Sequence, residues 1–454
     1  MNANAPITVL GAGLSGALIA IFLARSGRRV DVCERRPDLR KVDMDAGRSI
    51  NLALAARGIH ALERAGVYGD VEPLLIPMRG RMLHAPDGTL SFVPYGQRPH
   101  EVIYSVSRPG LTRALLDHAQ RRYGVMPRFL QQCRSLDFEG DRLQLLDEVS
   151  GEHYERAMAP LVAADGAGSV VRRAMMGQLG HHCREDMLDA GYKELTLPPG
   201  PDGTSQIEKH ALHIWPRGGF MLIALPNLDG SFTVTLFLAL KGTESFERLD
   251  GREAVEAFFA RHFPDVVPLM PGLAREFLEH PVGRMGTVHC DRWTAPGGRA
   301  VLLGDAAHAI LPFHGQGMNA CFEDCGELDR LLHETGGDCA RAFEEFERVR
   351  RPNTDAIAAM AFENYVEMRD TVRDPGFLRR KELAFELERR FPGRFIPRYS
   401  MVTFHHEIPY AVARERGRVQ EEILAQAAAA SPPDAAAALE AAGAAVLARL
   451  PPLA

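Results

Sequence analysis

The stretch that decides the fold is VLLGDAAHAILPFHGQGMNACFED, residues 301–324. Residues 300–303 form a short apolar run typical of a buried strand, and Gly304-Asp305 ends it with the backbone freedom and short carboxylate that a sharp turn needs. Pro312 stops any helix begun in this turn, and a new helix is predicted from about Met318. A helix start offers unpaired backbone N–H groups with a partial positive charge, so the turn is suited to binding an anion. Taken alone, the stretch also fits an ordinary strand-to-helix loop.

A second glycine-rich turn lies near the amino end, between an apolar strand and a helix. It carries Gly11, Gly13 and Gly16 in the pattern GxGxxG, and a second strand, residues 29–33, ends at Glu34. In a dinucleotide site of this type the first glycine permits a tight turn, and the second lets a pyrophosphate approach the backbone. The third lets helix and strand pack closely, and the acid accepts a hydrogen bond from a ribose hydroxyl. The order of elements therefore predicts a dinucleotide site, the alternative being a glycine-rich helix start without a ligand.

Two further strand ends carry an aspartate. Asp165 follows the apolar run 161–164, and Asp305 follows the run described above, so the three motifs lie about 150 residues apart. A cofactor that contacts such distant strand ends must be long and extended, as FAD is, whereas a nicotinamide dinucleotide normally needs one βαβ half and its mate. A helix predicted from residue 109 starts beside Arg108, which brings further positive charge to a phosphate.

The rest of the chain separates into strand-rich and helix-rich parts. Short strands with turns are predicted over residues 79–107, and a strongly β pattern runs over 206–241, with a hairpin loop at 226–230. After Asp324 the pattern is mostly helical. We therefore predict an α/β fold with a Rossmann-like FAD-binding domain, interleaved with a mostly antiparallel β-sheet substrate domain, plus a C-terminal α-helical region. The predicted boundaries are 1–75, 105–180 and 285–335 for the FAD-binding domain, 76–104 and 181–284 for the substrate domain, and 336–454 for the helical region.

Length and composition are those of a soluble globular protein. The chain has 454 residues, 46% hydrophobic and 25% charged, and its net charge of -6 gives no indication of nucleic-acid binding. Cys321 and Cys325 are four residues apart, as on one face of a helix, but no further ligands complete a metal site, so we expect no bound metal. The cysteine usage also predicts a protein of the reducing cytoplasm. No long apolar run predicts a membrane span. The alanine-rich tail, residues 425–454, is predicted to form a terminal helix or a partly disordered segment.

The three motifs together resemble those of the single-component FAD-dependent aromatic hydroxylases, which share the fold of 4-hydroxybenzoate hydroxylase. They are GAGLSG at 11–16, ADGAGS at 164–169 and LLGDAAHA at 302–309. The resemblance implies that Asp305 binds the ribityl chain of FAD, and that Asp165-Gly166 belongs to a segment associated with both FAD and NADPH. A second glycine-rich nucleotide domain is missing from the sequence, which agrees with enzymes in which NADPH docks transiently.

A closer resemblance, spread over the whole chain, is to the kynurenine-hydroxylating branch of this family. It implies L-kynurenine as the substrate, held at its amino-acid end by Arg81, Tyr95, Asn364 and Tyr399. A guanidinium can bind a carboxylate through two hydrogen bonds, and phenols and an amide add directed ones. Without the resemblance, these residues would be read as a surface arginine, turn tyrosines and a helix asparagine. The stretches that carry it are residues 47–54, 80–84, 104–108, 192–196, 213–217, 312–319 and 364–369.

The resemblance also assigns the ring end of the substrate pocket and completes the cofactor site. Phe232, Pro312, Phe313 and His314 would line the ring end. For His314 the alternative is a packing role beside the flavin, and no proton transfer is assigned to it. The cofactor-binding residues expected from the motifs and the resemblance are Gly11, Gly13, Gly16, Glu34, Arg35, Arg108, Asp165, Asp305, Gly315, Gly317, Met318 and Asn319.

The reaction implied by the resemblance is reduction of FAD by NADPH, addition of O₂ at flavin C4a to give a hydroperoxide, and transfer of one oxygen atom to the ring carbon next to the aniline nitrogen. Since the ring is electron-rich and the cofactor carries the chemistry, no side-chain nucleophile or base is expected. Two alternatives stay open: a hydroxylase of another anionic aromatic acid, and a flavoprotein that binds a ligand without turnover. Eukaryotic members end in a hydrophobic membrane anchor; the tail here is less hydrophobic, so we expect a cytoplasmic protein without an anchor. The sequence predicts no particular oligomeric state.

Overall fold

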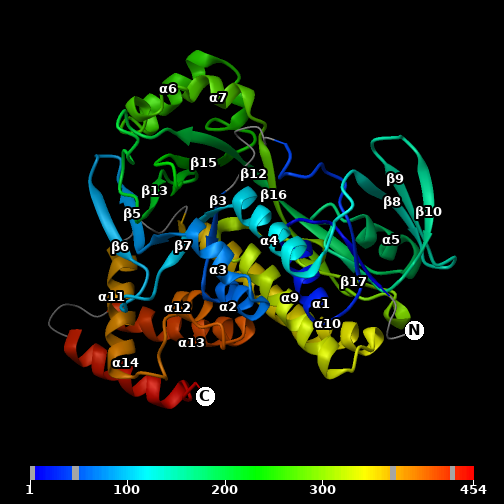
Figure 1. Ribbon diagram of the computed structural model, residues 1–454. Helices are drawn as coiled ribbons and strands as arrows, with labels where there is room; N and C mark the ends of the chain where they lie inside the picture. Colours follow the sequence, from blue (N-terminus) through cyan, green and yellow to red (C-terminus); the bar gives the residue numbers. More distant parts are fainter. Residues whose placement is uncertain (1–5, 43–50, 369–374, 430–434, 454) are drawn as a thin grey trace.

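The computed structural model describes residues 6–42, 51–368, 375–429 and 435–453 (Figure 1). Three predictions reach beyond these ranges. Residues 47–50 and Arg369, which belong to stretches that carry the family resemblance, lie outside the described residues, and so do residues 430–434 of the alanine-rich tail.

A four-stranded parallel sheet forms the centre of the predicted FAD-binding part. Its order is β17-β11-β1-β2, and every residue of β17, β11 and β1 is buried, as continuous apolar sequences predict for a parallel sheet. Because parallel strands end at the same edge, the glycine turn, Asp165 and Asp305 meet there, so the predicted convergence of the three motifs is confirmed. The strands are Ile7–Leu10 (β1), Val30–Cys33 (β2), Leu161–Ala163 (β11) and Ala300–Leu302 (β17).

A group of mutually packed helices accompanies this sheet. The first, α1, is buried along most of its length and packs against α4 and α9, while the long α10 follows α9 along the same side of the molecule (Figure 1). The prediction of a helix after residue 318 is confirmed, with the start one residue earlier. The bounds are Leu14–Arg25 (α1), Ala56–Ala65 (α2), Tyr68–Val71 (α3), Arg108–Tyr123 (α4), Val170–Leu179 (α5), Asp305–His308 (α8), Gly317–Glu334 (α9) and Cys339–Val366 (α10).

A seven-stranded, mostly antiparallel sheet forms the predicted second part, in the order β16-β12-β15-β14-β13-β5-β6. The predicted hairpin loop joins β14 to β15, and β5 and β13 run parallel. Helices α6 and α7 cover the sheet face that points away from the FAD-binding part (Figure 1). The elements are Gly80–His84 (β5), Leu90–Pro94 (β6), Cys183–Leu197 (β12), Leu212–Pro216 (β13), Met221–Pro226 (β14), Phe232–Ala239 (β15), Gly283–Cys290 (β16), Arg252–His262 (α6) and Leu273–Glu279 (α7).

Two small sheets complete the strands. One, in the order β3-β7-β4, connects the two parts, and the other, β10-β9-β8, projects beside α5 (Figure 1). Their strands are Asn51–Leu54 (β3), Ile76–Met78 (β4), Ile103–Ser107 (β7), Gln131–Asp137 (β8), Arg142–Asp147 (β9) and His153–Ala157 (β10).

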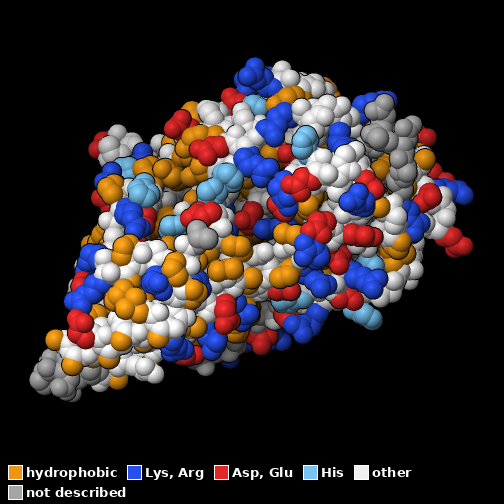
Figure 2. Space-filling model, turned by 90° about the horizontal axis from the view of Figure 1, so that it is seen from below, with side chains coloured by type: hydrophobic (Ala, Val, Ile, Leu, Met, Phe, Trp, Pro, Cys, Tyr) orange, Lys and Arg blue, Asp and Glu red, His pale blue; other side chains and the backbone are white. Residues whose placement is uncertain are grey.

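The C-terminal part is helical, as predicted, and lies below β5 and β6 in the view of Figure 1, with α13 packed against α10. Figure 2 shows this side, where acidic and basic side chains are interspersed over the surface with hydrophobic side chains between them. Among the helices of the described chain, none is long and apolar enough to cross a membrane. The helices are Pro375–Arg390 (α11), Arg398–Thr403 (α12), Tyr410–Ala428 (α13) and Ala435–Arg449 (α14).

Candidate active site

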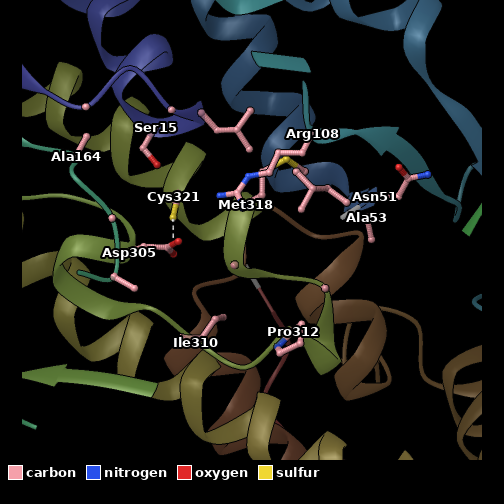
Figure 3. A pocket seen from close by; sticks show the side chains of 18 of the residues that line it. Ser15, Asn51, Ala53, Arg108, Ala164, Asp305, Ile310, Pro312, Met318 and Cys321 are labelled. Carbon is pink, nitrogen blue, oxygen red and sulfur yellow. Dashed lines mark hydrogen bonds between the residues drawn. The ribbon is translucent and has the colours of Figure 1, made fainter. Parts of the chain in front are cut away.

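A cavity of about 610 Å³ runs from the carboxyl edge of the parallel sheet to the face of the seven-stranded sheet. At one end it is lined by Gly11 and Gly13, and at the other by Arg81 and Tyr399. The walls between them come from β3, from the ends of β11 and β17 and from the start of α9 (Figure 3). Each predicted motif therefore contributes to one continuous site.

The glycine turn is packed too closely for side chains. A Cβ on Gly11 would lie 2.4 Å from the carbonyl oxygen of Ala164, and the backbone φ of Gly11 is +95°. A Cβ on Gly16 would lie 1.8 Å from the carbonyl oxygen of Gly11. This geometry agrees with the roles expected of the first and third glycines: Gly11 and Gly13 line the cavity, whereas Gly16 brings α1 against the strand end.

Glu34 holds the glycine turn in shape. Its carboxylate accepts hydrogen bonds from the backbone N–H of Ala12 at 2.7 Å and from the backbone N–H of Arg36 at 2.9 Å. Glu34 and Arg35 both line the cavity, as expected, and Arg36 does so as well. A hydrogen bond from a ribose hydroxyl to Glu34 stays a prediction.

Asp165 presents an unpaired acceptor beside the cavity. Its Oδ2 accepts from the backbone N–H of Val170 at 2.7 Å, while its buried Oδ1 has no partner among the described residues. Burial raises the pKa of Asp165, with hydrogen bonds from α5 opposing the rise. A buried acceptor without a donor is costly, so this oxygen fits a hydroxyl-bearing ligand in the cavity.

Asp305 begins the short helix α8, immediately after a glycine that tolerates no side chain. A Cβ on Gly304 would lie 2.9 Å from Ser15 Oγ and 3.0 Å from Cys321 Sγ. The Asp305 carboxylate lines the cavity, and the Cys321 thiol donates to its Oδ1 at 3.8 Å (Figure 3).

The turn after α8 places a second helix start at the cavity. Gly315 has a φ of +67°, and α9 begins at Gly317, so that Gly317 and Met318 line the wall at the helix N-terminus. Arg108 extends into the cavity close to Met318 (Figure 3). Unpaired N–H groups and a guanidinium together provide a positive field for an anionic ligand.

Asn319 differs from its expected role, because its side chain does not line the cavity. It is fully buried, its Oδ1 accepts from the backbone N–H of Ala55 at 2.9 Å, and its Nδ2 donates to the carbonyl oxygens of Ala53 and Gly315. Asn319 therefore connects the turn before α9 to β3, which forms the opposite wall of the cavity.

At the other end of the cavity, Arg81 lies beside a stacked pair of tyrosines. The rings of Tyr95 and Tyr399 are 5.5 Å apart and inclined by only 9°, and the guanidinium carbon lies 5.6 Å and 5.1 Å from their centres. Burial alone would lower the pKa of Arg81, but the two phenols and Glu367 raise it above its usual value. The structure thus brings three residues from β5, from the turn after β6 and from α12 together at one cationic site; that they bind the amino-acid end of a substrate stays a prediction.

The ring-end expectation needs one correction. Pro312, Phe313 and His314 line the cavity, but Phe232 does not. Side chains alternate between the two faces of a strand, and Phe232 lies on the face of β15 that packs under α6 and α7. The cavity face of β15 instead carries Phe237, whose ring lies 5.0 Å from that of Phe313, together with Thr233 and Thr235.

Asn364 also lies one layer behind the cavity. It is buried in α10, and its Nδ2 donates to the carbonyl oxygen of Phe313 at 2.6 Å. The structure therefore gives Asn364 a contact with the turn that lines the cavity, instead of the direct position beside Arg81 that the resemblance implied.

His314 is neutral in this environment. Burial lowers its pKa to about 3, and nearby Arg398 and Arg81 act in the same direction. Its ring stacks on Tyr399 at 5.4 Å and 14°. The packing alternative for His314 agrees with this geometry.

Comparisons with known proteins identify a matching family and full-length relatives. A family model described as FAD binding domain matches residues 4–357. A kynurenine 3-monooxygenase of Myxococcus xanthus is 46% identical over 98% of this chain and 96% of its own length. One from Stenotrophomonas maltophilia is 46% identical over 100% of this chain and 98% of its own length.

The chain belongs to the kynurenine 3-monooxygenase family. It is a flavin-dependent monooxygenase with an FAD-binding domain. Solved structures show the same fold at lower identity: tetrameric 2-methyl-3-hydroxypyridine-5-carboxylic acid oxygenase has a TM-score of 0.66 and 21% identity, covering 83% of this chain and 95% of that one. PqsL of P. aeruginosa in complex with 2-aminobenzoylacetate has a TM-score of 0.64 and 20% identity, covering 81% of this chain and 97% of that one.

The residues of this member of the kynurenine 3-monooxygenase family fit FAD. The glycine turn and the start of α1 suit a pyrophosphate, since both offer backbone N–H groups close to the cavity. The unpaired Oδ1 of Asp165 suits a hydroxyl group of the cofactor. The start of α9 and Arg108 suit the anionic edge of a flavin.

Sequence reasoning missed a buried charge network behind the FAD site of this family member. Arg350 lies 2.7 Å from Asp324 and 2.7 Å from Glu323, and Asp324 also contacts His308 at 2.6 Å. Although burial lowers the pKa of Arg350, the two carboxylates raise it above its usual value. The backbone N–H of Gly304 donates to Asp324 at 3.3 Å, so the network supports the turn that carries Asp305.

A second missed residue is Arg172, which is almost completely buried in α5. It donates to the carbonyl oxygen of Ala306 at 2.9 Å and to that of Ala167, and thereby ties together the segments that carry the second and third motifs. The Arg172-Arg173 pair reads in the sequence as a solvated helix face, and only the tertiary contacts distinguish one arginine from the other.

Proposed function

We propose that this protein hydroxylates L-kynurenine at the ring 3-position, with FAD as its bound cofactor and NADPH and O₂ as co-substrates. The observation that carries the proposal is the guanidinium of Arg81 beside the stacked rings of Tyr95 and Tyr399, close to both, at one end of the cofactor cavity. The names of relatives that are 46% identical over almost the whole chain support the same substrate.

Arg81 supplies the carboxylate site of the proposed complex. An arginine can bind a carboxylate through two parallel hydrogen bonds, which fix the direction of the substrate as well as its position. Tyr95 and Tyr399 are both neutral, because burial raises the pKa of each phenol, so both can donate a hydrogen bond to the same carboxylate.

The other end of the substrate is then directed towards the turn before α9. Phe237, Phe313 and Pro312 give this part of the cavity apolar walls, which exclude water and confine an aromatic ring. When bound, FAD accepts reducing equivalents from NADPH and delivers one oxygen atom of O₂ to the ring.

Proton transfer by a side chain is not part of the proposal. His314 is neutral, with its Nδ1 lacking a hydrogen-bond partner in the described residues, and it lies against Tyr399 as a packing surface. The chain's contribution is binding, orientation and the positive field of Arg108 and the α9 N-terminus near the cofactor.

One assay tests the proposal against its alternatives. NADPH oxidation by the purified, FAD-loaded protein is measured with L-kynurenine, with 4-hydroxybenzoate and without an aromatic compound, and 3-hydroxykynurenine is quantified by mass spectrometry. We expect product and fast NADPH oxidation with L-kynurenine alone. Hydroxylation of 4-hydroxybenzoate in place of L-kynurenine would indicate that the substrate is a different aromatic acid. No product with either compound would favour a flavoprotein that binds a ligand without turnover.

A further inference from the structure

Two cysteines face each other at the ends of neighbouring strands. Cys183 is the first residue of β12 and Cys290 the last of β16, and they are register partners. The adjacent residue pair, His182 and Asp291, is hydrogen-bonded: the backbone N–H of Asp291 donates to the carbonyl oxygen of His182 at 3.0 Å. Hydrogen-bonded and non-hydrogen-bonded pairs alternate along antiparallel strands, so the cysteines form a non-hydrogen-bonded pair, in which Cα atoms lie about 4.5 Å apart.

This spacing permits a disulfide. Disulfides span Cα separations of roughly 4.4–6.8 Å, so the pair lies at the short end of the range, where strained bonds are more easily reduced. Both cysteines are free thiols. We propose that Cys183 and Cys290 form a reversible dithiol–disulfide site that reacts with hydrogen peroxide.

The two thiols differ in a way that suits this chemistry. The neighbouring Cys290 thiol lowers the pKa of the Cys183 thiol, and the nearby guanidinium of Arg172 lowers it further, although burial and the carboxylates of Asp291 and Glu185 oppose both. The Cys183 thiol and burial raise the pKa of Cys290. Cys183 is half-buried and Cys290 buried, so Cys183 is the attacking sulfur and Cys290 the resolving one.

The reaction balances with peroxide as the only oxidant. The Cys183 thiolate attacks one oxygen of hydrogen peroxide, the O–O bond breaks, and a sulfenic acid forms while the departing hydroxide becomes water. The Cys290 sulfur then attacks the Cys183 sulfur, the S–O bond breaks, and the second hydroxide takes the thiol proton as water. Two thiols are oxidised by two electrons in total, and one peroxide is reduced to two waters.

The position of the pair connects it to the cofactor site. Arg172, whose guanidinium acts on Cys183, also binds the carbonyl oxygens of Ala306 and Ala167 in the two segments that line the FAD cavity. Hydrogen peroxide is the product that a flavin monooxygenase releases when reduced oxygen is not transferred to a substrate. The dithiol therefore lies next to an arginine that contacts two segments of the cavity in which its oxidant would form.

The test uses the purified FAD-loaded protein with added hydrogen peroxide and without NADPH, so that it does not depend on the proposed substrate. After blocking of free thiols and digestion without reductant, we expect a linked peptide pair containing Cys183 and Cys290, with the loss of two hydrogens in mass and reversal by dithiothreitol. The variants C183S and C290S should each lack the linked pair, whereas C339S, which changes another half-buried thiol, should keep it.

Two results would overturn the proposal. One is that both thiols remain free at peroxide concentrations that oxidise exposed methionines in the same sample. The other is that Cys183 proceeds to the sulfinic acid without forming a link to Cys290. Cys321 and Cys325, which share a face of α9 and whose thiol pKa values burial raises well above normal, serve as an unreactive pair within the same digest.

Discussion

The guanidinium of Arg57 in helix α2 donates from Nε to the carbonyl oxygen of Val402 at 2.9 Å. The same side chain contacts the carbonyl oxygen of His405 at 3.0 Å and pairs with Glu323 at 2.8 Å. Helix α12, which carries Tyr399, ends at Thr403, so Arg57 satisfies carbonyl oxygens that the helix end leaves unpaired. The FAD-binding part thereby fixes a helix that completes the substrate end.

Replacing Arg57 by Met should affect both stability and substrate binding. The change leaves several buried carbonyl oxygens without a donor and removes one of the two arginines that pair with Glu323, which we expect to lower the free energy of unfolding by about 3–5 kcal/mol. It should also raise the KM for L-kynurenine, because Tyr399 loses its fixed position. Urea unfolding and steady-state kinetics measure the two effects. Arg418→Met, which removes an exposed ion pair on α13, is the matched control, and wild-type values for Arg57→Met would contradict the assignment.

Arg81→Ala should weaken substrate binding without loss of FAD. A hydrogen bond to a charged group contributes about 1.5–3 kcal/mol, which corresponds to an increase in KM of roughly 10- to 150-fold. Arg79→Ala, an exposed arginine two residues earlier, should leave KM unchanged. The flavin absorbance of each purified variant shows whether the cofactor site is intact. An unchanged KM in Arg81→Ala would remove this residue from the carboxylate site.

Glu34→Ala and Asp305→Ala should purify with little FAD. The first variant removes the acceptor that holds the backbone N–H of Ala12, and the second removes the carboxylate at the start of α8. The ratio of flavin to protein absorbance measures retention, before and after dialysis against excess FAD. Glu155→Ala, a change on the projecting β10 strand, is the control and should remain yellow. Full flavin content in both site variants would refute these roles.

Phe237→Ala and Phe232→Ala should fail in different ways, because the two rings lie on opposite faces of β15. Phe237→Ala opens the cavity, so we expect more hydrogen peroxide and less 3-hydroxykynurenine per NADPH oxidised. Phe232→Ala leaves a hole in the core under α6 and should cost about 3–5 kcal/mol of stability, with near-normal coupling in the folded protein. If Phe232→Ala lowered the coupling and Phe237→Ala lowered only the stability, Phe232 would be assigned to the ring end of the pocket.

Lys381 should make substrate binding depend on pH near neutrality. Burial, with the nearby charge of Arg81, lowers the pKa of Lys381 to about 7, and Glu367 opposes this shift. The ammonium is therefore charged below about pH 7 and neutral above it, so binding of a carboxylate at Arg81 should tighten as pH falls from about 8 to about 6. KM measured across this range gives the dependence. Lys381→Met should flatten it, and an identical profile in the variant would exclude Lys381 as the source.

The sequence alone was sufficient for the parts of the site that depend on backbone geometry. A glycine turn or an aspartate at the end of a buried parallel strand must come to the same sheet edge, so Gly11, Asp165 and Asp305 could be placed together from their local patterns. The apolar runs that form β1, β11 and β17 could be read in the same way, because strands buried on both faces need no alternation.

Tertiary structure decided the parts that depend on which side of an element faces the cavity. The alternation in β15 puts Phe232 and Phe237 on opposite faces, but the sequence could not indicate which of the two faces lines the cavity. Asn319 and Asn364 were placed in the correct region but one layer too close, because an amide serves equally well to bind a ligand or a backbone. The local sequence did not indicate the structural roles of Arg57, Arg172 and Arg350. Their roles come from partners far away in the chain, which only the packing of the helices brings within hydrogen-bond distance.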